Sequence, residues 1–339
     1  MSPALVVILR IAAALGLMLA NGVVLIYMLR KVLGHLHVRI GPAHVGPKGI
    51  LQTTMDVLKL LTKEDITPSA VDKALFFIAP AAVFVPSLAA YAALPFGGTW
   101  RITNLDTGLL YTFAALSLVP IGILMAGWAS ANKWSLLGGM RAAAQQIAYE
   151  VPLLLSVLPI VMFTGTLNLG EIVQSQGGLW LGVVPRWHIT FPLFWPTFLI
   201  FCIAALVELN QTPFDMSEAE SELVAGFASE YSAMKFGLLF LSEFSNQFIV
   251  SALAVVLFFG GGMIPWAPQS WYAAVPILAP AAFIIKTYIG IFVMMWIRGT
   301  FPRVRIDQLM SLGWKWLIPA SLGWILVTGL IVKLTQGVG

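Results

Sequence analysis

The sequence predicts an all-α, polytopic membrane protein with about eight transmembrane helices and one amphipathic helix at the membrane interface. Of its 339 residues, 59% are hydrophobic and 10% are Asp, Glu, Lys or Arg, whereas about a quarter of the residues are charged in ordinary soluble domains. The mean hydropathy is +0.89, and apolar runs of about 20 residues, long enough to cross a bilayer, recur along the chain. We therefore expect a single transmembrane domain over residues 1–339.

Eight apolar runs mark the expected spans. The first is too long for the apolar region of a signal peptide and leads into Arg30 and Lys31 without a small-residue cleavage pattern, so we expect it to be retained. Gly-Pro pairs, prolines and tryptophans between the runs are typical of turns and interfacial anchors. The expected spans are 6–29, 74–95, 109–131, 147–166, 189–207, 236–263, 272–297 and 316–332.

Lys and Arg residues fall mainly in alternate loops of this arrangement. The loops 30–73, 132–146, 208–235 and 298–315 hold seven, two, one and four of them, whereas the three intervening loops hold one, one and none. Because Lys and Arg concentrate on the cytoplasmic side of membrane proteins, we expect the first set of loops to be cytoplasmic. An even number of spans then places both termini on the non-cytoplasmic side of what we expect to be a bacterial inner membrane.

The first of these loops contains an amphipathic segment. Leu51, Met55 and Leu58 recur at helical spacing on one face, and polar residues that include Asp56 and Lys59 occupy another. This pattern fits an interfacial helix with snorkelling lysines. The alternative is a helix that lines an entrance for a lipid headgroup or a substrate.

Four ionisable residues interrupt or end the apolar spans: Glu150, Glu208, Glu243 and Lys286. A charge inside a bilayer is costly and marks a functional position by default. A buried carboxylate either finds a partner or holds a proton, and holding a proton is what a proton relay requires. The structural alternative for each residue is an ion pair or hydrogen bond that locks two helices together, but three such carboxylates together favour a relay.

The fifth and seventh loops carry opposite charges. Six acidic residues in 208–230 meet no basic residue before Lys235, and Ser217 with Glu220 has the form of a capping box that starts a short helix. Acids in a first helical turn can simply complement the helix dipole, but this explains one or two residues rather than the cluster, which could store and pass protons. The seventh loop has a Pro-Arg-x-Arg-x-Asp pattern, which reflects positive-inside charge or pairs with the acidic loop or with a docked partner.

Composition excludes several classes of site in this chain. Cys202 is the single cysteine, so the chain forms no internal disulfide and cannot hold an iron–sulfur cluster, which needs about four cysteine ligands. Four scattered histidines give little support for haem, and we expect no metal site and no flavin. The net charge of +4 is explained by topology, and we expect no nucleic-acid partner.

Several segments of the sequence are similar to those of a known family. The segments are Arg39-Ile40-Gly41-Pro42, Lys59-Leu60-Leu61-Thr62-Lys63-Glu64-Asp65, the run from Ser135 to Gln145, the run Glu218-Ala219-Glu220-Ser221-Glu222 to Phe227, and Asp307-Gln308-Leu309-Met310. Together they resemble, in the same order from about Arg30 to Leu317, the H-subunit family of respiratory complex I, the proton-pumping NADH:quinone oxidoreductase.

This resemblance implies a membrane-arm subunit of an enzyme complex, without a complete redox centre of its own. Quinone, either ubiquinone or menaquinone, would be the substrate that enters through this subunit. The implied partners are hydrophilic-arm subunits with the quinone headgroup site and the terminal iron–sulfur cluster, small and antiporter-like membrane-arm subunits, and lipid. The implied quinone tunnel and its loops contain Arg30, Arg39, Asp56, Phe214, Asp215, Arg298, Arg303 and Arg305, and the implied proton relay contains Glu150, Glu208, Glu218, Glu220, Glu222 and Glu243.

Four positions depart from the family pattern. Leu29 replaces the usual Glu, Ala43 the usual Asn, Gln211 the usual Arg and Ile306 the usual Tyr. The loss of an acid at 29 and a base at 211 is either mutually compensating or reflects a divergent donor or quinone. Two alternative functions are the membrane subunit of a related energy-converting hydrogenase-type complex and a stand-alone proton- or cation-coupled carrier.

Overall fold

The computed structural model describes residues 3–98, 100–180, 182–216, 224–267 and 269–336, and it confirms the predicted all-α membrane fold. Seven helical segments within these residues are long and apolar enough to cross a membrane. They are α1 (Pro3–Leu36), α3 (Lys73–Tyr91), α4 (Gly108–Leu116) with α5 (Val119–Ala129), α6 (Lys133–Thr164), α10 (Ala233–Phe258), α12 (Leu278–Thr300), and the stretch of α13 (Ile306–Ser311), a π-helix (Leu312–Leu317) and α14 (Ile318–Gln336). A shorter apolar helix, α8 (Trp195–Glu208), occupies the position of the expected fifth span.

Short elements connect these helices. The amphipathic segment of the first loop forms α2 (Gln52–Thr62), as predicted. The other connections contain α7 (Leu169–Ser175), α11 (Gln269–Ala274), the 3₁₀ turns η1 (Pro47–Gly49), η2 (His188–Thr190), η3 (Pro192–Phe194) and η4 (Gly226–Ala228), and two small antiparallel hairpins. The hairpins pair β1 (Pro95–Gly97) with β2 (Trp100–Arg101) and β3 (Leu179–Trp180) with β4 (Val184–Pro185).

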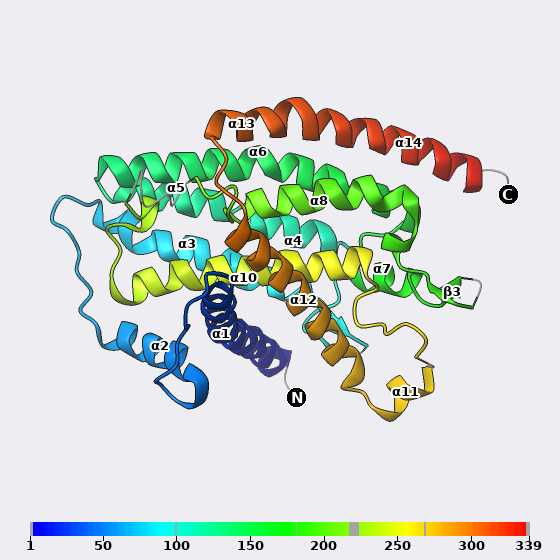
Figure 1. Ribbon diagram of the computed structural model, residues 1–339, viewed down its shortest axis with the longest axis horizontal. Helices are drawn as coiled ribbons and strands as arrows, with labels where there is room; N and C mark the ends of the chain where they lie inside the picture. The colour runs from blue at the N-terminus through cyan, green and yellow to red at the C-terminus, as the bar shows by residue number, and fades with distance from the viewer. Residues whose placement is uncertain (1–2, 99, 181, 217–223, 268, 337–339) are drawn as a thin grey trace.

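The helices α3, α5, α6, α8 and α10 run roughly parallel or antiparallel in a packed bundle, with α1 and α12 crossing one side and α14 along the opposite edge (Figure 1). In α10, 72% of the apolar segment is buried, against 22% in the first helix and 17% in the last. The centre of the bundle is therefore α10, whereas α1 and α14 present most of their apolar surface outward.

Small residues let α6 approach its neighbours closely. A Cβ atom built on Gly138 would lie 2.7 Å from the Cα atom of Gly226 in η4, and one on Gly127 of α5 would lie 3.1 Å from the Cα atom of Gly139. Small residues are favoured at helix contacts in membranes because they allow the backbones to come together. The first contact holds the segment around η4, which follows the acidic part of the fifth loop, against α6, and the second brings α5 against α6.

Several helices extend beyond the spans expected from the sequence. The first helix continues to Leu36, and α6 already begins at Lys133, so that most of the loop expected at 132–146 is helical. Asn132 begins α6 by accepting a hydrogen bond from the backbone N–H of Trp134 at 3.0 Å. The third span is divided at Ser117 and Leu118, where α4 ends and α5 begins. Helical hydrogen bonding does not stop at the membrane surface, and apolar content alone does not report where it ends.

Candidate functional site

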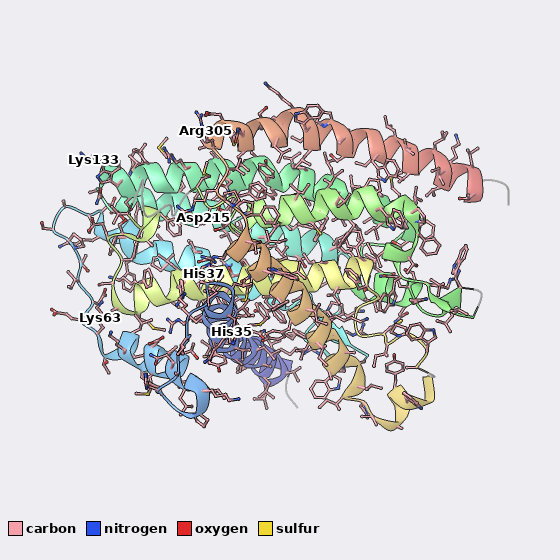
Figure 2. The ribbon with its side chains drawn as sticks, in the orientation of Figure 1. His35, His37, Lys63, Lys133, Asp215 and Arg305 are labelled. Atoms are coloured by element: carbon pink, nitrogen blue, oxygen red, sulfur yellow. The ribbon has the colours of Figure 1, made fainter. Side chains whose placement is uncertain are left out.

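Asp215 and Arg305, from the fifth and seventh loops, lie in the left half of the view in Figure 2, as do Lys63 and Lys133. Here the fifth loop, at 209–216, lies against the seventh loop, at 301–305. The backbone N–H of Val304 donates to the carbonyl of Pro213 at 2.9 Å. The two loops of opposite charge therefore pack on one another.

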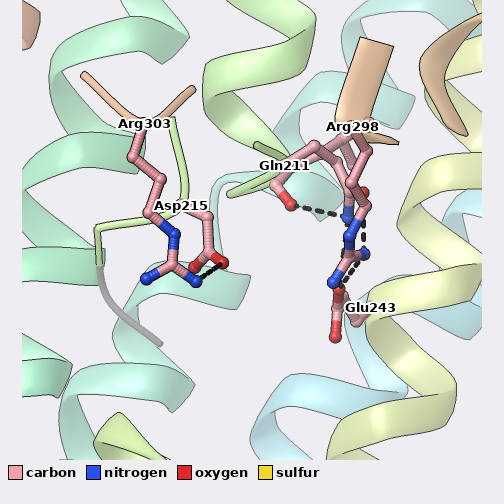
Figure 3. A network of polar contacts seen from close by, with 6 residues as sticks. Gln211, Asp215, Glu243, Arg298 and Arg303 are labelled. Atoms are coloured by element: carbon pink, nitrogen blue, oxygen red, sulfur yellow. Dashed lines mark hydrogen bonds and ion pairs between the residues drawn. The ribbon is translucent and has the colours of Figure 1, made fainter. Parts of the chain in front are cut away.

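The first contact of the network joins Arg303 and Asp215. The guanidinium of Arg303 donates to Oδ2 of Asp215 at 3.2 Å (Figure 3). The Asp215 side chain is only 10% exposed, and its other oxygen, Oδ1, is buried without a hydrogen-bond partner. A buried acceptor with free capacity is available to a water molecule or to a polar group of a ligand.

The second contact joins three elements through an amide. Arg298, near the end of α12, donates to Oε1 of Gln211 at 2.9 Å, and Nε2 of Gln211 donates to Oε1 of Glu243 in α10 at 3.2 Å (Figure 3). The guanidinium of Arg298 also lies 3.9 Å from the same carboxylate oxygen. Gln211 is one of the departures from the family pattern. Its side chain therefore connects Arg298 of α12 to Glu243 of α10.

Two glutamines of α6 hold the fifth loop in this position. Nε2 of Gln145 donates to the carbonyls of Val207 and Phe214, both at 2.9 Å, and Nε2 of Gln146 donates to the carbonyl of Glu208 at 3.2 Å. Both side chains are buried. They bind carbonyls in the last turn of α8, where helices carry unpaired acceptors, and one carbonyl of the fifth loop.

A cavity of about 170 Å³ lies between the carboxylates of Glu208 and Glu243. Its polar lining includes these two acids with Gln146, Asn210 and Asn246, and the rest of its lining is mainly apolar. Oε2 of Glu208 is buried there without a partner, as is Oδ1 of Asn246. A cavity of this size with unpaired polar groups is suited to hold several water molecules.

Glu150 extends the line of carboxylates along α6. It lies beside Ser117, at the break between α4 and α5. It is also close enough to Glu208 for the two carboxylates to interact. Glu208 is thus related to both other acids of the apolar spans, since it interacts with Glu150 and lines one cavity with Glu243.

Comparison with known proteins relates this arrangement to one family. Residues 9–329 match the family described as NADH dehydrogenase. A protein of Brevibacillus brevis is 46% identical over 329 residues, which cover 96% of this chain and 94% of the relative, and one of Rhodospirillum rubrum is 41% identical over 329 residues with the same coverage. A protein of Dehalococcoides mccartyi is 43% identical over 315 residues, covering 92% of this chain and 83% of its own. Each of the three is named as the H subunit of NADH-quinone oxidoreductase.

The chain belongs to the H-subunit family of NADH-quinone oxidoreductase. The resemblance predicted from short motifs is thereby confirmed over nearly the whole chain. Members of this family are parts of an oxidoreductase complex, and this chain is a multi-pass membrane subunit of that kind. The three relatives are quinone oxidoreductase subunits by name, which favours this assignment over the hydrogenase-type and carrier alternatives.

The first loop of this oxidoreductase subunit contains a separate pair of site candidates. Arg30, in α1, forms an ion pair with Oδ2 of Asp56 in α2, and Gln52 donates to the other oxygen of Asp56 at 3.1 Å. This pair connects the interfacial helix to the first span. Arg39 is exposed in the loop between the two helices.

Arg305 differs from the other arginines of the seventh loop. Its contact is an ion pair with Asp307 at 3.3 Å, and the two side chains are 81% and 73% exposed. Ion pairs of this kind contribute little to stability. Arg305 is therefore free to move toward a bound molecule or another subunit.

The remaining predicted relay residues, Glu218, Glu220 and Glu222, lie outside the described residues. Among the parts of the chain that are described, no group of three or more His, Cys, Asp or Glu side chains is placed to hold a metal ion. Sequence reasoning missed Gln145, Gln146 and Asn246 as parts of the site. Neutral amides inside apolar spans are the signal that could have found them, since each needs a buried polar partner.

Proposed function

We propose that this subunit forms the quinone entrance and part of the quinone tunnel of a proton-translocating NADH:quinone oxidoreductase, and that it links quinone reduction to proton transfer through its buried glutamates. The observation that carries the proposal is a pair of contacts made with the fifth loop: Arg303 with Asp215, and Arg298 with Gln211, which continues to Glu243 and its cavity. It joins a region that can sense charge to groups that can hold protons.

The quinone side of the proposal uses the first, fifth and seventh loops. The α2 helix exposes Leu58 and Leu61, which suit an isoprenoid tail arriving from the bilayer, and the Arg30–Asp56 pair positions this helix. Arg39, Arg298, Arg303, Arg305, Phe214 and Asp215 would line the tunnel or its loops. Ubiquinone or menaquinone would be the substrate.

The coupling side uses electrostatics. Reduction of quinone to quinol takes up two electrons and two protons, and protons taken from side chains of the site would change the charge near Asp215 and Arg303. Because the fifth and seventh loops are hydrogen-bonded to each other, this change alters the position of Gln211 and Arg298 relative to Glu243. A carboxylate that loses its cation binds a proton more readily, and the cavity would pass that proton by way of water to Glu208 and then to Glu150. Glu218, Glu220 and Glu222 would extend the relay.

The proposed surroundings follow from the family. Hydrophilic-arm subunits would supply the quinone headgroup site and the terminal iron–sulfur cluster, and antiporter-like subunits would receive the coupling signal. The distribution of Lys and Arg supports an inner-membrane orientation with the network on the cytoplasmic side and both termini on the other side.

The test separates quinone reduction from pumping in the assembled complex. Glu208→Gln removes a carboxylate that is 8% exposed and lines the cavity, so we expect quinone reduction to continue while the number of protons moved per quinone falls. Glu150→Gln should act in the same direction. The matched control is Glu171→Gln, which changes an acid in α7 that bonds to Thr166 outside this line. Full pumping by an assembled Glu208→Gln complex would exclude Glu208 from the relay.

A further inference from the structure

Lys286 is an intramembrane cation that the proposed relay does not use. From the third turn of α12, its ammonium group donates to three carbonyls that follow the end of α10: Phe259 at 2.8 Å, Gly261 at 3.0 Å and Met263 at 2.6 Å. It also lies 4.2 Å from the ring centroid of Trp187, over the aromatic face. This end of α10 lies beside α7, away from the fifth and seventh loops (Figure 1).

The contacts of Lys286 suit an ammonium group. An ammonium group has three N–H donors and no acceptor, and here it meets three carbonyl acceptors and a ring face that attracts cations. A neutral amine would have to direct its lone pair at a carbonyl oxygen. Gly260 and Gly261 have φ values of 68° and 55°, a conformation that favours glycine and that turns the chain so that the carbonyls converge. The fold thus builds a fixed positive charge at this end of the bundle.

Neutral groups already satisfy the last carbonyls of α10. Nε2 of Gln176 donates to the carbonyl of Val256 at 2.8 Å, and its Oε1 accepts from the N–H of Gly260 at 3.0 Å. Nδ1 of His188 lies 2.6 Å from the carbonyl of Leu257. Burial lowers the pKa of His188 to about 4, so its ring is neutral near pH 7 and Nδ1 carries the donated proton. The carbonyls of Val256 and Leu257 are therefore paired without a charge, and Lys286 binds the carbonyls of the turn that follows them.

Polar side chains of α10 lead from the carboxylate cavity toward Lys286. Asn246 lines the cavity beside Glu243, and the next residue, Gln247, has a buried Nε2 without a partner. One turn further, Ser251 donates to the carbonyl of Thr287 at 2.8 Å, and Thr287 directly follows Lys286. A buried polar atom without a protein partner, such as Nε2 of Gln247, can be satisfied by an ordered water molecule. A proton that left Glu243 along α10 would thus approach Lys286.

We propose that Lys286 is an electrostatic barrier that prevents protons from leaking along α10 to the membrane face opposite the fifth and seventh loops. Fixed positive groups exclude protons and cations from polar pathways in membrane proteins. By Coulomb's law with an effective dielectric constant of about 20, a unit charge about 10 Å from the path lowers proton occupancy roughly tenfold. The proposed role concerns passive proton leakage, which can be measured without quinone reduction. Its test is therefore independent of the proposed quinone function.

The experiment measures passive proton flux through the assembled complex in liposomes, without NADH or quinone. A potassium diffusion potential drives protons, and a trapped pH-sensitive dye reports their entry. We expect Lys286→Met to raise the flux about tenfold and Lys286→Arg to keep it near the wild-type value. Gln176→Leu is the matched control, because it removes hydrogen bonds from the same turn but leaves the charge. It should lower thermal stability without raising the flux.

Two further variants keep the test decisive if Lys286→Met does not assemble. Lys286→Gln removes the charge but retains amide donors, and Trp187→Glu places a carboxylate beside the ammonium while Lys286 remains. Both should raise the flux. A wild-type flux in any assembled variant that removes or neutralises the charge would overturn the barrier. An equal rise with Gln176→Leu would also overturn it, since the effect would then come from loss of packing.

Discussion

Replacement of Arg298 by Gln should weaken the connection between the seventh loop and the sixth span by an amount that the structure allows us to estimate. The guanidinium of Arg298 lies 3.9 Å from Oε1 of Glu243, which gives about 4 kcal/mol for two unit charges at an effective dielectric constant of about 20. Their side chains are 26% and 23% exposed, so water reduces this value. We take about 2 kcal/mol, which is roughly a 30-fold change in an equilibrium or rate.

A double-mutant cycle measures this quantity. Quinone reduction by the assembled complex is compared for Arg298→Gln, Glu243→Gln, the double variant and the wild type, and kcat/KM values are converted to free energies. We expect the double variant to be less impaired than the sum of the single variants by about 2 kcal/mol, because the second substitution removes the charge that the first left unpaired. The control cycle pairs Glu243→Gln with Arg101→Gln, since Arg101 is exposed and bonds to Asn104. Effects of Arg298 and Glu243 that add within about 0.5 kcal/mol would refute the coupling.

Three other predictions address the site and the fold. Asp215→Asn should slow quinone reduction about tenfold, because a hydrogen bond to a charged group contributes about 1.5 kcal/mol or more, whereas Asp307→Asn in its exposed pair should stay within about twofold; equal effects would contradict the assignment of Asp215. Gly138→Ala should cost about 1–3 kcal/mol, measured as a lower thermal midpoint, because its Cβ would meet backbone at 2.7 Å, whereas Gly16→Ala meets nothing within 4 Å and should be tolerated. The lowered pKa of His188 means that the unfolded chain binds a proton that the folded chain does not, so folding stability should fall by about 3 kcal/mol as the pH decreases from 6.5 to about 4. His188→Asn should flatten this dependence, and an unaltered pH profile would show that another group causes it.

Charged residues in apolar spans were the part of the site that sequence reasoning could find. Glu150, Glu208 and Glu243 stand out because each carboxylate interrupts a long apolar run, and the structure relates Glu208 to both of the others. Contact between the oppositely charged fifth and seventh loops was one of the alternatives for the seventh-loop arginines, and Arg303 with Asp215 is such a contact. Charge is visible in a sequence because it is rare in a membrane.

The neutral partners could not be predicted in the same way. Gln211 was recognised only as a departure from the family pattern, and nothing in the sequence shows that its amide bridges Arg298 and Glu243. The partners of Lys286 are backbone carbonyls, which every residue possesses. Such contacts depend on where the chain turns, and this is decided by tertiary packing.

The sequence predicted where the spans lie but not where the helices begin and end. Apolar runs located the spans because burial in lipid requires them. The early start of α6 at Lys133 depends instead on the Asn132 cap and on the glycine contacts of α6 with α5 and η4. Hydropathy carries no information about such contacts.

The low burial of the last helix has a consequence for how this chain tolerates change. The α14 helix is held chiefly by α6 and by a hydrogen bond from the indole N–H of Trp324 to the carbonyl of Leu193 at 3.1 Å. Leu326, Leu330 and Leu334 are more than 60% exposed. Within this chain, exchange of one large apolar residue for another at these positions carries almost no penalty. Constraints on the shape of these side chains must therefore come from whatever lies against them in the membrane. Sequence variation among relatives on this face would then reflect the neighbouring surface rather than the fold of the chain.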